Sequence, residues 1–200
     1  MVTTTAERGL FFFRRFLRNP REVGALCPST RHLAATMVRG LDLPGDAVVV
    51  EYGVGTGSFT PAISALVDAT PGARYLGIER EPGFCDILQR RFPSLAFANA
   101  QVEDVERLLR ERGLGAPRAI LSGLPLILLP TMEEIVATTA RVLAPGGEFR
   151  TFSYLQSWPA PGAFRLRRLM KATFAEFSTS RLVLRNFPPA FVLRGRKAAA

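Results

Sequence analysis

The stretch AVVVEYGVGTG at residues 47–57 decides the fold expected for this chain. Its first six residues form a short valine-rich run, which is typical of a strand buried in a parallel sheet. The glycines that follow have no Cβ atoms, so they permit a tight turn and let the backbone approach a ligand closely. Because ligands of open α/β sheets bind at the carboxyl ends of strands, this turn is the first candidate for a binding site.

The same pattern recurs along the middle of the chain. Further strands are predicted at residues 74–79, 95–98, 119–122 and 148–154, and helices at 59–67, 83–92, 102–112 and 131–143. This alternation predicts a parallel sheet with helices on both faces. The tail departs from it, with a basic helix predicted at 163–177 and strands at 181–186 and 191–196, joined by a turn at Pro188 and Pro189.

Length and charge limit the possible architectures. A chain of 200 residues fits one α/β domain, with residues 1–40 as a helical cap and 41–200 as the core. Residues 1–40 hold seven arginines and two acids, residues 41–150 ten arginines and fourteen acids, and residues 151–200 nine basic residues and one acid. An acidic centre with two basic ends suggests that the termini face an anionic partner, which charge alone does not identify.

Several classes of protein are not expected. No stretch reaches the roughly 18 consecutive apolar residues that span a bilayer, so we expect a cytoplasmic protein. Cys27 and Cys85 are far apart and are read as free thiols. His32 is the single histidine, so no metal site is expected.

Two carboxylates flank the glycine turn. Glu51 precedes the first glycine by two residues, and Glu79 ends the next predicted strand. A glycine-rich turn alone would also suit a dinucleotide. Carboxylates beside the turn would, however, repel the pyrophosphate of that ligand. The pattern ExGxGxG resembles the S-adenosylmethionine motif, and that ligand carries a sulfonium and an ammonium instead of phosphates. An ordinary strand-to-helix turn and a dinucleotide site are the alternatives.

The resemblance implies the fold and a set of cofactor contacts. It implies a Rossmann-like class I methyltransferase, with a mostly parallel seven-stranded sheet, a C-terminal antiparallel hairpin and an N-terminal helical cap. Two acceptor oxygens on Glu79 would match the two ribose hydroxyls, and Glu51 would organise the turn. The cofactor-binding candidates are Glu51, Gly53, Gly55, Gly57, Glu79, Arg80, Asn99, Ala100 and Ser122.

The loop Ser122-Gly123-Leu124-Pro125 follows the fourth predicted strand. Amino-methyltransferases place a related loop here, which presents an oxygen to the substrate nitrogen. Methyl transfer from a sulfonium disperses charge, so the site must supply a neutral amine, alignment and dryness more than a strong base. The catalytic candidates are Ser122, Gly123, Leu124 and Tyr154; the alternative for the loop is a plain strand-ending turn.

Wider similarity points to one family. The segments 16–21, 24–31 and 185–190, together with the glycine turn, residues 122–126 and Tyr154, resemble bacterial phospholipid N-methyltransferases. That family converts phosphatidylethanolamine towards phosphatidylcholine, so the resemblance implies a membrane phospholipid as substrate. The candidates for holding the lipid phosphate and amine are Arg31, Tyr154, Arg185 and Asn186.

The N-terminus supports a membrane partner. At about 100° per residue, the apolar residues of 10–17 other than Phe11 fall on one side of a helix, and Phe11 and the arginines fall on the other. Such a helix is typical of segments that lie in the membrane interface, although a helix packed on the domain is the alternative. We therefore expect peripheral association with an anionic membrane surface. The membrane-binding candidates are Phe11, Phe12, Phe13, Arg14, Arg15, Phe16 and Arg18.

Three other functions remain open. An RNA adenine-N6 methyltransferase shares the glutamate-glycine turn and the basicity, but Leu126 stands where an aromatic residue would stack on a flipped base, so nucleic acid is not the expected partner. A non-catalytic membrane-binding protein with a vestigial cofactor fold is a second alternative. A methyltransferase for a soluble amine, with residues 1–40 as a lid, is the third.

Overall fold

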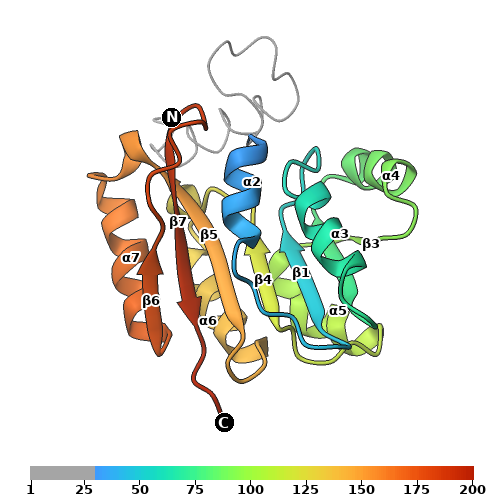
Figure 1. Cartoon of the computed structure of the whole chain (residues 1–200). Coiled ribbons are helices and arrows are strands. Elements are labelled where there is room, and N and C mark those ends of the chain that lie inside the picture. Colours follow the sequence, from blue (N-terminus) through green and yellow to red (C-terminus); the bar gives the residue numbers. More distant parts are fainter. Residues whose placement is uncertain (1–29) are drawn as a thin grey trace, which may run out of the picture.

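A seven-stranded sheet runs through the computed structural model, which describes residues 30–200 (Figure 1). Its strand order is β3-β2-β1-β4-β5-β7-β6. Strands β1 to β5 pair in parallel, whereas β7 is antiparallel to both β5 and β6. The mostly parallel sheet with an antiparallel C-terminal pair confirms the predicted fold class. The strands are β1 (Val48–Tyr52), β2 (Arg74–Glu79), β3 (Ala96–Asn99), β4 (Ala119–Ser122), β5 (Glu148–Tyr154), β6 (Glu176–Thr179) and β7 (Ala190–Arg196).

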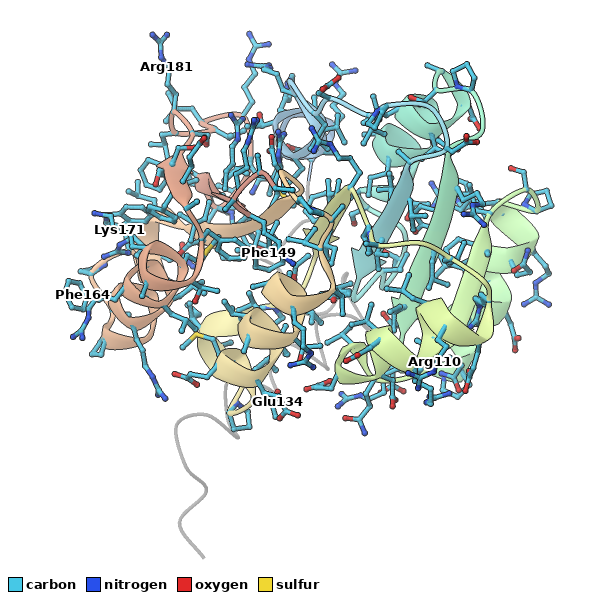
Figure 2. All side chains as sticks on the ribbon, turned by 90° about the horizontal axis from the view of Figure 1, so that it is seen from below. Arg110, Glu134, Phe149, Phe164, Lys171 and Arg181 are labelled. Atoms are coloured by element: carbon cyan, nitrogen blue, oxygen red, sulfur yellow. The ribbon has the colours of Figure 1, made fainter. Side chains whose placement is uncertain are left out.

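Helices cover both faces of this sheet. Helices α5, α6 and α7 lie on one face, and α2 and α3 lie on the other, as the view from below shows (Figure 2). The helices are α2 (Arg31–Val38), α3 (Thr60–Asp68), α4 (Pro82–Arg91), α5 (Val105–Glu111), α6 (Met132–Val142) and α7 (Pro161–Thr173). Short 3-10 turns are η1 (Val102–Asp104), η2 (Leu126–Leu128) and η3 (Leu155–Ser157).

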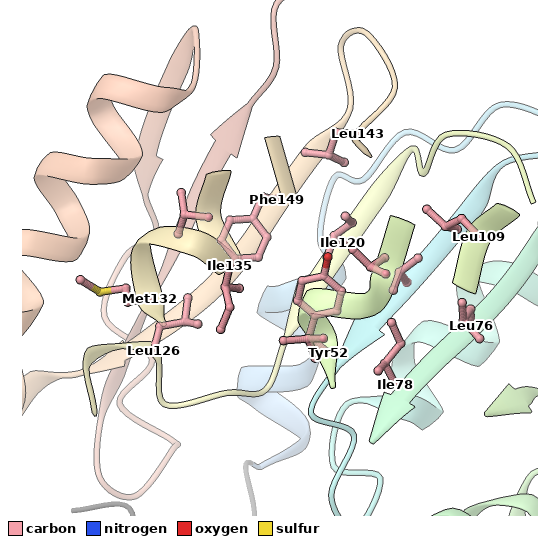
Figure 3. Packing of buried hydrophobic residues seen from close by; sticks show 14 of the residues in the cluster. Tyr52, Leu76, Ile78, Leu109, Ile120, Leu126, Met132, Ile135, Leu143 and Phe149 are labelled. Atoms are coloured by element: carbon pink, nitrogen blue, oxygen red, sulfur yellow. The ribbon is translucent and has the colours of Figure 1, made fainter. Parts of the chain in front are cut away.

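The core is divided into two layers by the alternation of side chains along the strands. On β1, Val48, Val50 and Tyr52 pack toward α5 and α6 with Ile120, Phe149 and Ile135 (Figure 3). Val49 points to the other face, where it joins the cluster that includes residues of α2 and α3. Every residue of β1 is buried, which explains why the valine run shows no polar alternation.

The C-terminal elements correct part of the prediction. The helix predicted to reach residue 177 ends at Thr173, and β6 begins at Glu176. Phe174 leaves the helix because its ring fills the space above Gly195, where a Cβ would collide with it, and stacks on Phe149. The predicted strand at 181–186 is wrong, since that segment makes only one isolated bridge, from Val183 to Ala190.

The described part of the N-terminal cap is helix α2. Thr30 caps it by accepting a hydrogen bond from the Leu33 amide, and Leu33 and Met37 are fully buried against the sheet. The predicted amphipathic helix at residues 11–18 lies outside the described residues. Within residues 30–200, no helix is long and apolar enough to span a bilayer.

A buried polar group joins β1, β2 and α3. The Oε2 atom of Glu51 accepts hydrogen bonds from the Tyr75 hydroxyl at 2.6 Å and the Thr60 hydroxyl at 3.0 Å. Only 1% of Glu51 is exposed, and its Oε1 atom has no partner among the described residues. Desolvation by burial, partly offset by these two hydrogen bonds, raises the pKa of Glu51 to about 7.

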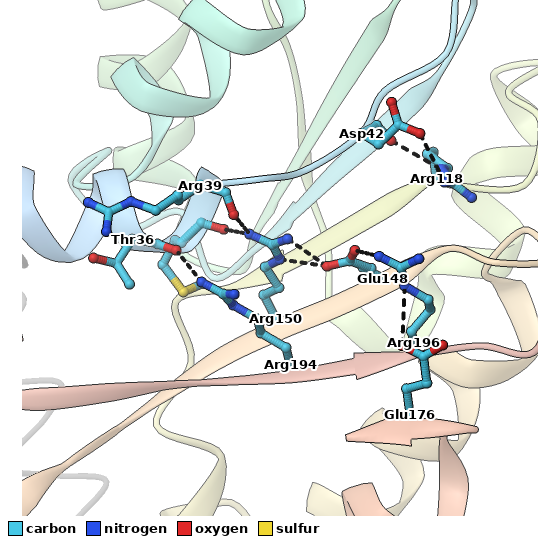
Figure 4. Close-up of polar contacts among 10 residues, drawn as sticks. Thr36, Arg39, Asp42, Arg118, Glu148, Arg150, Glu176, Arg194 and Arg196 are labelled. Carbon is cyan, nitrogen blue, oxygen red and sulfur yellow. Dashed lines mark hydrogen bonds and ion pairs between the residues drawn. The ribbon is translucent and has the colours of Figure 1, made fainter. Parts of the chain in front are cut away.

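A second buried cluster fixes the end of α2 to the sheet (Figure 4). The Arg150 guanidinium donates to Glu148 Oε2 at 2.6 and 2.9 Å, and to the carbonyl oxygens of Met37 and Arg39 at 2.9 and 2.8 Å. Arg196 donates to the other Glu148 oxygen at 2.7 Å. Because the Arg150 side chain is only 2% exposed, solvent cannot replace these contacts.

The Glu51 carboxyl predicts a pH-dependent stability difference. Between the ordinary pKa of 4.5 and the folded value of about 7, the unfolded chain loses this proton while the folded chain keeps it. Stability contributed by the protonated carboxyl is therefore present below pH 4.5 and lost as the pH rises through about 7. Relative to the Glu51→Gln variant, the native chain should lose up to about 3 kcal/mol over this window, measured by urea unfolding. Glu134→Gln, on an exposed face of α6, is the control and should show no such trend; a pH-independent difference for Glu51→Gln would contradict the assignment.

The Arg150 cluster predicts a large stability loss. The variant Arg150→Met leaves Glu148 with one partner and strands two buried carbonyl groups, so the free energy of unfolding should fall by about 3–5 kcal/mol. Arg141→Met is the matched control, because Arg141 pairs with Glu106 with 59% of its side chain exposed. Its effect should be much smaller. Equal losses in chemical denaturation would show that the buried cluster has no special role.

Candidate active site

A cavity of about 290 Å³ opens where the parallel strands end. It lies between the glycine turn after β1, the end of β2, and the loops after β3 and β4, with side chains of β5 at its wall. A binding site was predicted from the sequence at this place, at the carboxyl ends of the strands. The lining residues are Gly53, Val54, Gly55, Thr56, Ser58, Phe59, Ile78, Glu79, Arg80, Glu81, Phe84, Ala100, Gln101, Val102, Glu103, Gly123, Leu124, Pro125, Leu129, Pro130, Thr131, Ile135, Phe152 and Tyr154.

The glycine turn has a backbone that requires glycine. Gly53, Gly55 and Gly57 have φ angles of 63°, 57° and 80°, a region that L side chains rarely adopt. A Cβ at Gly53 would also collide with the Leu124 side chain. The turn therefore presents bare backbone to the cavity, and two of its three glycines line it.

Glu79 connects this turn to the neighbouring strand. Its Oε2 atom accepts the Gly55 N–H at 2.8 Å, and its Oε1 atom accepts the Glu81 N–H at 2.9 Å. The residue is only 7% exposed, yet it lines the cavity. Each carboxylate oxygen can accept more than one hydrogen bond, so Glu79 keeps acceptor capacity for a ligand that carries adjacent hydroxyls.

The loop after β4 lies directly against the glycine turn. The Gly123 amide donates to the Tyr52 carbonyl oxygen at 2.8 Å, and a Cβ at Gly123 would lie 2.7 Å from the Gly53 carbonyl oxygen. Ser122 is fully buried and its hydroxyl accepts from the Leu124 amide at 3.2 Å, so it shapes the loop from behind. Gly123 and Leu124 line the cavity, whereas Ser122 does not.

Tyr154 closes the opposite wall. It ends β5, lines the cavity, and packs edge to face on Phe152 with ring centroids 5.3 Å apart. Burial raises the pKa of the Tyr154 hydroxyl above its ordinary value of 10.0. The hydroxyl therefore stays protonated at neutral pH and can orient a polar group by hydrogen bonding without acting as a phenolate.

Of the other cofactor candidates, some line the cavity and others support it from behind. Arg80 and Ala100 line it. Asn99 does not; its side-chain amide donates to the carbonyl oxygens of Glu79 and Arg80 at 3.1 and 2.8 Å and so supports the loop after β2. Glu51 lies behind the turn, facing α3, and contributes no surface to the cavity.

The substrate candidates are not gathered in one place. Tyr154 lines the cavity, but Arg185 lines a separate cleft of about 520 Å³ that shares no residue with it. Asn186 is 2% exposed and its amide accepts from the Thr30 N–H at 2.9 Å and donates to the Pro188 carbonyl oxygen at 2.7 Å. Arg31 begins α2 and lines neither space.

Most cavity residues had not been singled out from the sequence, and Phe152 and Glu103 are two of them. Phe152 precedes Tyr154 by two residues, so the period of a strand places both on one face. Glu103 belongs to η1, in the connection that leaves the carboxyl end of β3. Within residues 30–200, no group of three histidine, cysteine or acidic side chains is arranged to hold a metal ion.

Comparison with known proteins identifies the class of this site. No family model matches the chain. It is 31% identical over 193 residues to the ornithine lipid N-methyltransferase of Singulisphaera acidiphila, covering 93% of this chain and 95% of the relative. It is 30% identical to the ribosomal RNA small subunit methyltransferase A of Thermotoga neapolitana, but over only 60% of this chain and 44% of that protein.

Solved structures agree on the fold. The magnesium protoporphyrin IX methyltransferase of Synechocystis PCC 6803, solved with bound S-adenosylmethionine, has a TM-score of 0.59 and 14% identity, covering 99% of this chain and 86% of that one. Such low identity supports the fold alone. Because the similarity to the Singulisphaera enzyme runs through nearly the whole of both sequences, the chain belongs to the class I S-adenosylmethionine-dependent methyltransferases, in the family that includes ornithine lipid N-methyltransferase.

Proposed function

We propose that this methyltransferase N-methylates the amine head group of a membrane lipid while the lipid remains in the bilayer. Phosphatidylethanolamine, converted towards phosphatidylcholine, is the substrate that the sequence resemblance favours. Ornithine lipid is the second candidate, because it is named for the relative that matches from end to end. That end-to-end similarity is the observation that carries the proposal.

The cavity fits S-adenosylmethionine, which supplies an electrophilic methyl group on a sulfonium. Glu79 would hold the ribose hydroxyls, because it lines the cavity and its carboxyl oxygens can accept further hydrogen bonds. The bare backbone of Gly53 and Gly55 would lie against the methionine portion. Glu51 acts from behind by fixing the start of α3 to β1 and β2, and Asn99 acts by shaping the loop that carries Arg80 and Ala100.

The loop of residues 122–125 would position the lipid amine. Its close contact with the glycine turn brings its backbone carbonyl groups near the place where a donor must lie. Tyr154 faces the same cavity from β5, and its protonated hydroxyl would orient the amine. The wall contributed by Phe59, Phe152 and Leu124 would exclude water, which favours the neutral amine that must attack.

Methylation of RNA is less well supported. The similarity to the ribosomal RNA enzyme covers less than half of that protein. The loop after β4 contributes no aromatic side chain to the cavity, and Leu126 is 1% exposed in the core under α6. An extruded base would therefore find no stacking partner on that loop. A non-catalytic role predicts no binding of the cofactor, which the next experiment measures.

Cofactor affinity should depend on Glu79. The variant Glu79→Ala removes two acceptor oxygens from the cavity, so the affinity for S-adenosylmethionine should fall on the order of 100-fold, measured by calorimetry. Asp86→Ala removes an exposed carboxylate from α4 outside the cavity and should bind normally. Glu79→Gln keeps the size of the side chain and separates loss of charge from loss of packing. Unchanged affinity in both Glu79 variants would refute this cofactor contact.

Lipid methylation can be read directly. The full-length protein is incubated with cofactor labelled on its methyl group and with vesicles that contain phosphatidylethanolamine, ornithine lipid or phosphatidylcholine alone, or with ribosomal RNA. Label should enter the phosphatidylethanolamine vesicles and not the phosphatidylcholine ones, which offer no free amine. Label in ornithine lipid alone would keep lipid N-methylation and replace its substrate, whereas label only in RNA would refute the proposal.

The same assay examines Tyr154. The variant Tyr154→Phe keeps the ring that packs on Phe152 and removes the hydroxyl, so kcat should fall about ten-fold while cofactor affinity is retained. A normal kcat would remove Tyr154 from the proposed site.

A further inference from the structure

A second cleft, of about 520 Å³, lies between α2 and the connection from β6 to β7. Within residues 30–200, no acidic side chain lines it, whereas four arginines and the single histidine do. The lining residues are His32, Ala35, Thr36, Arg39, Thr179, Ser180, Arg181, Leu182, Val183, Leu184, Arg185 and Arg194. The cleft therefore concentrates positive charge in one concave surface.

The cationic groups of this cleft have few partners of their own. Arg194 donates only to the Thr36 carbonyl oxygen, at 3.4 Å, and its Nε atom is buried without a partner among the described residues. Within residues 30–200, no acidic side chain pairs with Arg39, Arg181 or Arg185. By contrast, Arg150 and Arg196, close to the same helix, are paired with Glu148 (Figure 4). The lining arginines are thus available to an anion from outside.

Exposed apolar side chains lie in the cleft lining and on the neighbouring chain. Leu184 is 74% exposed and Phe187 is 64% exposed, both on the connection from β6 to β7. Leu155, 42% exposed on η3, lies beside that connection, because its amide donates to the Pro189 carbonyl oxygen at 2.8 Å. Arg181 projects outward from the body of the molecule (Figure 2). Cations mixed with exposed apolar side chains are the composition of a surface that enters the membrane interface.

The connection from β6 to β7, which bounds the cleft and carries Leu184 and Phe187, leaves the sheet at the same edge as the cavity. Strands β5 and β6 are both antiparallel to β7, so β6 runs in the same direction as β1 to β5. The chain after Thr179 therefore leaves the sheet at the edge where β1 to β5 also end (Figure 1). A flat partner that contacts Leu184 and Phe187 would therefore face the edge at which the cavity opens.

We propose that the arginine cleft and its rim of Leu184 and Phe187 dock this enzyme on an anionic lipid bilayer. The arginines receive phosphate groups of anionic lipids, for which the planar guanidinium fork is suited, while the apolar rim enters the interface. This proposal rests on the proposed function, since it names the surface that brings the cavity to a lipid amine.

Charge selects this occupant over two others. Residues 1–29 hold five arginines and two glutamates, so the charge of that segment has the same sign as the charge of the cleft and does not complement it. An RNA would satisfy the arginines, but it offers no apolar environment for an exposed Leu184. A bilayer with anionic lipids satisfies both features at once.

The test measures binding of the full-length protein to vesicles by sedimentation. Arg39→Gln/Arg181→Gln should weaken binding to vesicles of phosphatidylcholine with phosphatidylglycerol on the order of 10-fold or more, because each basic residue near such a surface adds to affinity. Leu184→Ser should weaken it by a few fold. The matched controls are Arg110→Gln/Arg112→Gln, which removes the same charge from the end of α5 at the opposite edge, and Ile87→Ser, which removes an apolar side chain that is 50% exposed on α4.

The outcomes separate docking from catalysis. Turnover of lipid dispersed in neutral detergent micelles should be unchanged in Arg39→Gln/Arg181→Gln, since neither side chain lines the cavity. Vesicle binding equal to that of the unaltered chain, or an equal loss in the Arg110 control, would overturn the docking surface. The docking surface would also be overturned if Arg39→Gln/Arg181→Gln lost binding to RNA but kept normal binding to vesicles. Failure of the unaltered chain to methylate micellar lipid would instead refute the proposed function. This result does not depend on vesicle binding.

Discussion

The carboxylate of Glu79 is the contact on which the candidate site depends. It ties the glycine turn after β1 to the chain that leaves β2, by accepting the amides of Gly55 and Glu81. The register of the two strands makes this possible, because Tyr52 pairs with Ile78 and the Gly53 amide continues the ladder to the Ile78 carbonyl oxygen. The next residue on β2 is then level with the turn, and the loop after β4 closes over the same turn through Gly123. The Glu79 side chain thus joins two of these segments, and the Gly123 amide joins the third to the turn.

The position of this site was predictable, whereas the burial of Glu51 was not. Valine-rich strands and glycine-rich turns identify the sheet and its carboxyl edge from local patterns. The family resemblance assigned different roles to Glu51 and Glu79, but it did not show that Glu51 faces α3 and contributes no surface to the cavity. A strand buried on both faces gives no polar pattern that reveals this. The tail was harder for a related reason: the turn of Phe174 away from α7 depends on the space above Gly195, which is distant in the sequence. Likewise, only the path of the connection from β6 to β7 separates Arg185 from Tyr154.

The charge pattern of the sequence acquires a spatial meaning in the fold. The acidic middle of the chain builds the cavity, where Glu79, Glu81 and Glu103 line the wall and suit a cationic ligand. The arginines around α2 and the C-terminal strands are used in two ways. Arg150 and Arg196 are consumed by Glu148 in fixing α2 to the sheet, whereas Arg39, Arg181 and Arg185 gather around a cleft without acidic partners. A net charge of +9 therefore understates how unevenly the cations are distributed.

Under the proposed function, the acyl chains decide how enzyme and lipid must meet. Withdrawing a lipid from the bilayer would expose those chains to water at a cost of about 0.8 kcal/mol per methylene group. The cavity instead presents the acidic side chains of Glu79, Glu81 and Glu103, which suit a cationic donor and an amine head group. The lipid must then stay in the membrane, and the carboxyl edge of the sheet must come to the head groups. An enzyme of this kind needs a surface that fixes its orientation as well as its affinity, and arginines bordered by Leu184 and Phe187 at that edge supply both.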